Sequence, residues 1–267
     1  YAAFGEFTWH ITGRLSLSPG IRYTYENKDG TFASAVSGGL ETRDANLISK
    51  KLSILRPQSY AAHVSDGSAS GRISADYRLT GGIMAYVSYA QGFKSGGLNM
   101  SGLPLNASNQ PALATAAIKP EKDSTSEIGF KTDFFGNRLL FNIDAYETLV
   151  RDYQTNVVDT GPGALRGYIA NIDRVRVKGV EIDSTVTFSE NLSAHLSTAW
   201  TDGKYISYVN GPCPLERIGT STVACDLSGK DLPGVSPWAA SAGGDGDIPV
   251  IIAHSPARAL SARRPRS

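Results

Sequence analysis

The 267-residue chain carries 26 lysines and arginines against 25 aspartates and glutamates, and a net charge of +1 gives no electrostatic basis for binding nucleic acid. No apolar run approaches the ~20 residues that a membrane helix needs. An apolar content of 41% still leaves a membrane β-barrel open, because only alternate residues of a barrel strand face lipid.

Four hairpins of alternating apolar and polar residues follow one another, with turns near residues 13, 81, 136 and 190. In the third hairpin Ile128 and Phe130 fall on one side, and Glu127 and Lys131 on the other. Side chains alternate across a strand, so each arm is predicted to be a strand with one apolar and one polar face. The pair at 136–137, Gly-Asn, is a tight hairpin signal. The Pro-Gly pair at 19–20 predicts a bulge or a weakened ladder.

Stretches without a clean period separate the hairpins and are interpreted as loops, at residues 27–66, 95–121, 153–173 and 209–235. Short turns that alternate with long loops, at a repeat of roughly fifty residues, are typical of outer-membrane barrels with periplasmic turns and extracellular loops. We therefore predict an all-β fold: an incomplete antiparallel transmembrane β-barrel of about eight long strands. The alternative, a soluble β-sandwich, has shorter strands and closer turns.

A ninth segment begins at Trp238, and its alternation fails at Asp245. Residues 245–267 carry four arginines among alanine, proline and serine. They are either a disordered basic tail or an out-of-frame continuation, and the odd strand count favours the second because single-chain bacterial barrels use even numbers. We expect a partial barrel over residues 1–244 and an irregular tail over 245–267.

Two sets of side chains are candidates for the membrane and lumen surfaces. Aromatic residues near strand ends fit the interfacial girdles of a barrel; they are Trp9, Tyr23, Tyr25, Tyr89, Phe93, Phe134, Phe135 and Trp200. Charged residues on the polar faces would line a wet lumen, where they affect ligand passage, contact a plug or only neutralise one another; they are Arg22, Arg72, Arg78, Lys94, Glu127, Lys131, Asp144, Glu181 and Asp183.

Cys213 and Cys225 lie in the fourth loop, and an oxidising cell surface predicts a disulfide between them rather than two unpaired thiols. The four histidines show no metal-ligand spacing, and neither a phosphate loop nor a nucleophile elbow occurs. We therefore expect no enzyme activity, no metal and no cofactor.

Residues 86–99, 118–154 and 168–188 resemble the barrel domain of TonB-dependent outer-membrane receptors. The Pro-Glu-Lys segment at 120–122, ahead of Ser-Glu-Ile-Gly-Phe-Lys at 126–131, is a specific feature, as is Lys-Gly-Val-Glu at 178–181. The resemblance runs from about residue 4 to 243. It implies a barrel in outer-membrane lipid, with a plug domain, which imports an iron-siderophore or another scarce nutrient with energy from the inner-membrane TonB complex.

The plug, the TonB-contacting box, the leader and further strands of that family have no counterpart in these residues, so we expect a middle-to-C-terminal barrel fragment. Unpaired strand edges in hydrocarbon cost several kcal/mol per group, so an open, curved sheet would need those missing parts as partners. The alternatives are a self-contained small outer-membrane barrel, a structural or adhesive β-protein, and a passive porin.

Overall fold

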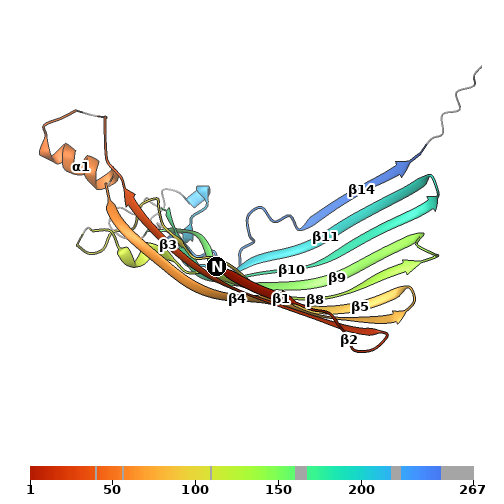
Figure 1. Ribbon diagram of the computed structural model, residues 1–267. Coiled ribbons are helices and arrows are strands. Elements are labelled where there is room, and N and C mark those ends of the chain that lie inside the picture. The colour runs from red at the N-terminus through yellow and green to blue at the C-terminus, as the bar shows by residue number, and fades with distance from the viewer. Residues whose placement is uncertain (40, 56, 109, 160–166, 218–223, 248–267) are drawn as a thin grey trace, which may run out of the picture.

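The computed structural model describes residues 1–39, 41–55, 57–108, 110–159, 167–217 and 224–247. Its main feature is one ten-stranded antiparallel sheet in the order β1-β3-β4-β5-β8-β9-β10-β11-β14, with β2 beside β3. Figure 1 shows this sheet as an open, curved surface, with the hairpin turns at one end and α1 at the other. The predicted antiparallel fold with an unclosed sheet is confirmed.

The hairpin arms are long strands, and short elements lie in the connections between them. The sheet strands are β1 (Ala2–Glu6), β2 (Trp9–His10), β3 (Leu15–Ala33), β4 (Ser59–Thr80), β5 (Ile83–Lys94), β8 (Glu121–Phe134), β9 (Leu139–Val158), β10 (Gly167–Ser189), β11 (Leu192–Ser207) and β14 (Trp238–Gly246). The other elements are α1 (Ala45–Leu55), β6 (Gly97–Leu98), η1 (Leu113–Thr115), β7 (Ala117–Ile118), β12 (Gly211–Pro212), η2 (Leu215–Arg217) and β13 (Ala224–Cys225).

The half of the sheet next to the hairpin turns has one apolar and one polar face. Val87 of β5 pairs with Ile128 of β8, and the two side chains are 53% and 57% exposed. Ile21 of β3, on the same face, is 67% exposed. Large apolar side chains left open along a whole face are expected where that face contacts lipid. We call this the outer face and the polar one the inner face.

At Pro19 and Gly20 the structure shows no bulge, but the ladder on one side of β3 is interrupted there, which is the weakened ladder that the sequence offered as the alternative. Both residues pair in register with β4, opposite Ile73 and Arg72. The irregularity falls on the neighbouring edge instead, between β1 and β2. The Phe7 N–H donates to the Pro19 carbonyl at 3.2 Å, and proline has no N–H to return a bond, so regular pairing stops there.

Two of the predicted loops are too long, because the strands extend further from the turns than the alternation does. β3 and β4 pair from Leu15 to Ala33, so the first loop is residues 34–58 and contains α1. β9 and β10 likewise pair as far as Val158 and Gly167. These extensions leave the apolar belt, so no apolar period marks them in the sequence.

Two smaller boundaries also differ from the prediction. The third hairpin turns over residues 135–138, with positive φ at Phe135, Gly136 and Asn137, rather than through a two-residue Gly-Asn turn. β14 continues past the predicted boundary to Gly246 and pairs with β11 along its whole length. The predicted tail falls mainly on residues 248–267, which lie outside the described part of the chain.

The buried apolar residues lie at the loop end of the sheet, in two clusters. One contains Val157, Ile172, Val175, Tyr205 and Tyr208, and the other contains Tyr60, Leu103 and Ala116. Among the described residues, no helix has the length and apolarity needed to cross a membrane. The packed core therefore belongs to the connections folded against the strand ends.

Candidate functional site on the inner face

Five of the predicted lumen residues gather on the inner face of β8, β9 and β10: Glu127, Lys131, Asp144, Glu181 and Asp183. The chain places them side by side, since Asp144 pairs directly with Glu181. Glu127 accepts a hydrogen bond from the Tyr86 hydroxyl at 2.6 Å, and the Lys131 ammonium lies 5.5 Å from the centre of the Tyr86 ring. The patch is therefore mainly acidic, with one lysine and one tyrosine along its border.

The other four predicted lumen residues are spread along the sheet. Arg22 of β3 lies 5.9 Å from the centre of the Phe4 ring, and its Nε donates to Thr24 at 3.1 Å. Arg72 pairs with Gly20, and Arg78 pairs with Met84 near the turn. Lys94 ends β5, where its ammonium lies 3.8 Å from the Glu121 carboxylate. The structure thus brings together the β8–β10 residues but not these four.

The second long connection, residues 95–120, crosses the inner face at the loop end of the sheet, and we call it the strap. Its first contacts are to β3 and β4. The Lys28 ammonium donates to Ser95 Oγ at 2.9 Å and to the Gly96 carbonyl at 2.7 Å. Gln58 exchanges two hydrogen bonds of 2.7 Å with the backbone of Leu103. The Tyr60 hydroxyl donates to the Asn99 carbonyl.

The strap is also attached to β9 and β10, on the far side of β5 and β8. Asn99 is 1% exposed, and its side chain bonds to the backbone of Ile169 in β10. Gln154 of β9 donates to the carbonyls of Ser95 and Lys119, both at 3.0 Å. Asn171 of β10 donates to the Lys119 carbonyl at 2.9 Å. A segment bound to both β4 and β10 must run over the face between them. The strap therefore covers part of the inner face at the loop end of the sheet.

Charge strengthens the attachment on the β3 side. The Lys28 ammonium lies 2.9 Å from the Glu26 carboxylate while it also holds residues 95 and 96. The hydrogen bond from Lys28 lowers the pKa of Glu26 below its usual value, with a smaller contribution from Ser95. Both side chains are more than a third exposed, so this pair is a wet ionic contact of modest strength.

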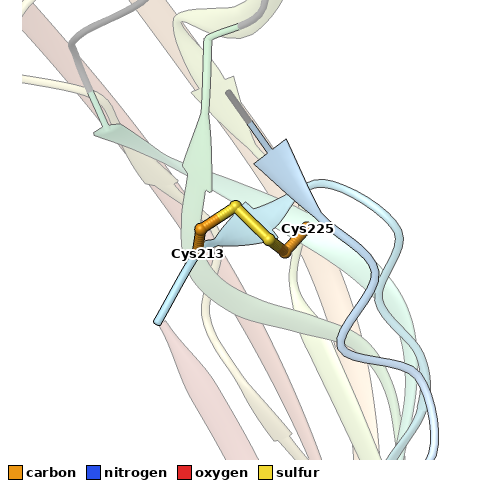
Figure 2. The surroundings of a disulfide bond; sticks show 2 residues. All are labelled: Cys213 and Cys225. Carbon is orange, nitrogen blue, oxygen red and sulfur yellow. A yellow bond between two sulfur atoms is a disulfide. The ribbon is translucent and has the colours of Figure 1, made fainter. Parts of the chain in front are cut away.

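The described parts of the fourth connection, residues 208–217 and 224–237, also pack on the loop end of the sheet. Leu227 and Leu232 lie against the cluster around Val175 and Tyr205. Figure 2 shows Cys213 and Cys225 joined beside the β12–β13 pair, with an S–S distance of 2.07 Å and a Cα–Cα distance of 5.0 Å. The disulfide joins two residues that are 12 apart in the sequence.

The predicted girdle aromatics occupy the outer face and the turns. Trp9, Tyr23, Tyr25 and Tyr89 are between 43% and 59% exposed, and Phe135 in the turn is 80% exposed. Phe93 pairs with Lys122 of β8 and Phe134 pairs with Leu139 of β9, and both share the outer face with Val87 and Ile128. Trp200 pairs with Trp238 on the last two strands. Their contact with the membrane interface stays a prediction.

Several side chains of this site could not be found from the alternating pattern. Lys28, Gln58, Tyr60 and Asn99 all lie in stretches that were interpreted as loops. Gln58 and Asn99 are buried polar residues, and only the tertiary structure shows their partners. Within the described residues, no group of three or more histidine, cysteine, aspartate or glutamate side chains could hold a metal ion.

The fold and the two-faced sheet define a membrane β-barrel segment, and comparison with known proteins gives its family. The family model for the TonB dependent receptor-like β-barrel matches residues 1–247. The chain therefore belongs to the TonB-dependent receptor β-barrel family, as its sequence motifs indicated. The family and its relatives are outer-membrane receptors and transporters, which confirms the predicted localisation and the prediction that the chain is not an enzyme.

Individual relatives agree with this family. The chain is 23% identical to the pesticin receptor of Yersinia enterocolitica over 192 residues, which are 72% of this chain and 24% of that protein. The ferric yersiniabactin uptake receptor of Yersinia pestis has the same fold, with a TM-score of 0.66 and 18% identity over 94% of this chain. The siderophore receptor PiuA of Acinetobacter baumannii also has this fold, with a TM-score of 0.61 and 19% identity over 91% of this chain. The chain spans 31% and 30% of those two structures.

Proposed function

We propose that this chain forms part of the barrel of a receptor that imports a scarce nutrient through the outer membrane, and that the nutrient is an iron-siderophore. The observation that carries the proposal is the strap, which lies across a polar inner face at the end where an external ligand arrives. In a complete barrel, this inner face lines the path of a ligand, and the strap over it restricts entry of the ligand. The iron-siderophore follows from the ligands named for two of the similar structures.

Three partners belong to this proposal. The edges at β1 and β14 each have a neighbour on one side only among the described strands, and further barrel strands would pair with them. A plug domain would contact the inner face, with the acidic patch on β8–β10 as part of its contact surface. The inner-membrane TonB complex would supply energy through regions beyond this chain.

Uptake of ferric siderophore by whole cells tests the proposal. Cells that lack the complete receptor should fail to grow when one defined ferric siderophore is the sole iron source, and the intact gene should restore growth. A proton uncoupler or loss of TonB should abolish accumulation of labelled iron while leaving surface binding. Uptake that continues without TonB would indicate a passive porin, and unchanged growth on every iron source would contradict the choice of ligand.

A further inference from the structure

The part of β4 next to the first long loop, residues 59–69, has an open edge on its β5 side. β4 pairs with β3 from Ser59 to Tyr77, but it pairs with β5 only from Gly71 to Thr80. β5 leaves β4 because its chain turns toward the inner face, where Lys28 of β3 holds residues 95 and 96. Since β4 and β5 are neighbours in the sheet, no further barrel strand can enter between them.

The backbone groups along this stretch point alternately to β3 and to the open edge. The Arg78 N–H donates to the Arg14 carbonyl, and the Gln58 carbonyl accepts from the Ser34 N–H, so even-numbered residues are bonded to the β3 side. Successive residues of an antiparallel ladder point to opposite sides. The N–H and C=O groups of the odd-numbered residues in 59–69 therefore point to the open edge, and no hydrogen bond from a described residue reaches them.

The chain covers comparable edge groups on its other long strands. The side chain of Asn99 binds both backbone groups of Ile169 in β10. The Gln154 N–H of β9 donates to the Glu121 carboxylate at 2.8 Å. Among the described residues, the edge at 59–69 has no such cover, so its exposure is a distinct feature of β4.

Residues 59–69 also lack the features that usually keep other chains away from a strand edge. Exposed edges are commonly protected by lysine, by proline or by a bulge. This stretch contains neither lysine nor proline, and its ladder with β3 runs without a shift in register. Its odd-numbered side chains are exposed and, apart from His63, small, whereas Tyr60 and the other even-numbered side chains are buried or half-buried. Another chain can therefore approach along the outer side.

The chemistry and position of the edge define its partner. Alternating N–H and C=O groups on an extended strand are matched by the backbone of another extended strand. A barrel strand crosses the hydrocarbon in about 9–11 residues, and β4 ends at its turn with Thr80, so residues 59–69 lie outside the membrane. They lie on the long-loop side, which is external in such a barrel.

A second copy of the receptor does not fit this edge. It stands in the membrane in the same orientation, so its β4 would lie parallel to the first. A two-fold axis along two parallel strands places N–H opposite N–H, which prevents pairing. We infer that residues 59–69 bind an extended segment of a different protein outside the cell, as one further strand beside β4.

Proline at position 65 tests the inference in the complete receptor. Ser65→Pro removes an N–H from the open edge and leaves the bonds to β3, and proline is tolerated where its nitrogen faces away from the ladder. Ser65→Val is the matched control. Both changes remove the 2.8 Å hydrogen bond between the Ser65 and Tyr25 hydroxyls, but only proline removes the N–H. If S65P does not insert, A61P with A61V as its control removes another N–H from the same edge.

Short peptides from a random display library serve as the first probe. They are selected on the parent receptor in lipid nanodiscs and counter-selected on S65P. The peptides that remain should bind S65V as they bind the parent, and S65P about tenfold more weakly. Methylating the amides on one edge of such a peptide should abolish binding, and methylating those on its other edge should not. The absence of any peptide that distinguishes S65P from S65V would overturn the inference, as would binding that tolerates methylation of both edges.

Cross-linking on intact cells tests the choice of partner. A photoreactive residue at position 61 should form an adduct with another protein in the S65V receptor and not in the S65P receptor. An adduct with the receptor's own loops, or no adduct, would contradict the choice of an external protein. Uptake of ferric siderophore is measured separately and should be the same in S65P and S65V. Failure of uptake in the parent contradicts the proposed function and leaves this inference unchanged.

Discussion

Asn99 and Ile169 are joined by a pair of hydrogen bonds that imitates the pairing of two strands. The Asn99 side-chain amide donates to the Ile169 carbonyl at 2.7 Å, and the Ile169 N–H donates to Asn99 Oδ1 at 3.1 Å. The same amide donates to the Thr115 carbonyl at 2.7 Å within the strap. One buried side chain therefore fixes the strap to β10, three strands beyond its start at β5.

Replacing Asn99 by alanine should release the strap from β10. The change leaves the Ile169 N–H and two carbonyls without these partners, at about 1–3 kcal/mol for each group that stays buried and unpaired. Amide hydrogen exchange in the complete receptor should accelerate over residues 97–118. Asn106, an exposed strap residue, provides the control, since its side chain accepts hydrogen bonds from residues 108 and 110 alone among the described residues. Equal exchange in N99A and N106A would show that Asn99 does not hold the strap.

Close packing at Gly30 should make that position intolerant of a larger side chain. A Cβ added there would lie 2.8 Å from the Leu98 side chain, with Met100 also adjacent, so valine must push the strap away from β3. Gly30→Val should therefore raise the rate of protease cleavage within the strap on intact cells. Gly5→Val is the matched control, since nothing lies within 4 Å of a Cβ at Gly5. Equal cleavage of both variants would contradict the packing described.

Removal of the disulfide should loosen the fourth connection without affecting the sheet. The bond joins residues 12 apart, and closing a loop of this size stabilises a fold by about 2–3 kcal/mol. The double variant C213S/C225S should be cleaved faster by external protease between β11 and β14, and barrel insertion should be unchanged. In the parent, a thiol-alkylating reagent should add mass only after reduction. Alkylation before reduction would show two free thiols instead.

The assignment of faces predicts opposite effects for a charge placed on the two sides of the sheet. Ile128→Arg puts a cation on the outer face within the apolar belt, which should destabilise the folded barrel by about 2–4 kcal/mol. Asn142→Arg puts the same cation on the inner face, between Asp183 and Lys131, where water and the carboxylate accept it. Urea titration in lipid vesicles measures both. A larger loss for the Asn142 variant would reverse the assignment of faces.

The alternation of residues such as Ile128 and Glu127 was enough to predict the strands and their two faces, because lipid on one side and water on the other impose a period of two. That signal ends where β3 and β9 leave the apolar belt, so the extended arms and the strap were interpreted as loops. The strap depends on Asn99 and Gln58, which are polar residues in an irregular stretch. Their partners lie up to 70 residues away, and no local pattern reports such contacts.

The arrangement of the inner charges was predicted only in part. The alternation of apolar and polar residues places Glu127, Asp144 and Glu181 on the polar face, but it does not show which of them are neighbours. That depends on the register between strands, which pairs Asp144 with Glu181 and leaves Arg78 near a turn. The pairing of Lys122 with Arg151, and of Arg151 with Arg174, was missed for the same reason, since the three residues come from separate strands.

The central claim is that this sheet is one part of a larger barrel and does not close by itself, since β1 and β14 are its two ends. The most direct test is migration of the refolded chain, residues 1–267, on a gel before and after heating in detergent. We predict aggregation and no compact form that heating converts, with compact migration recovered when the remaining strands are restored. A compact, protease-resistant, heat-modifiable band from residues 1–267 alone would contradict this account.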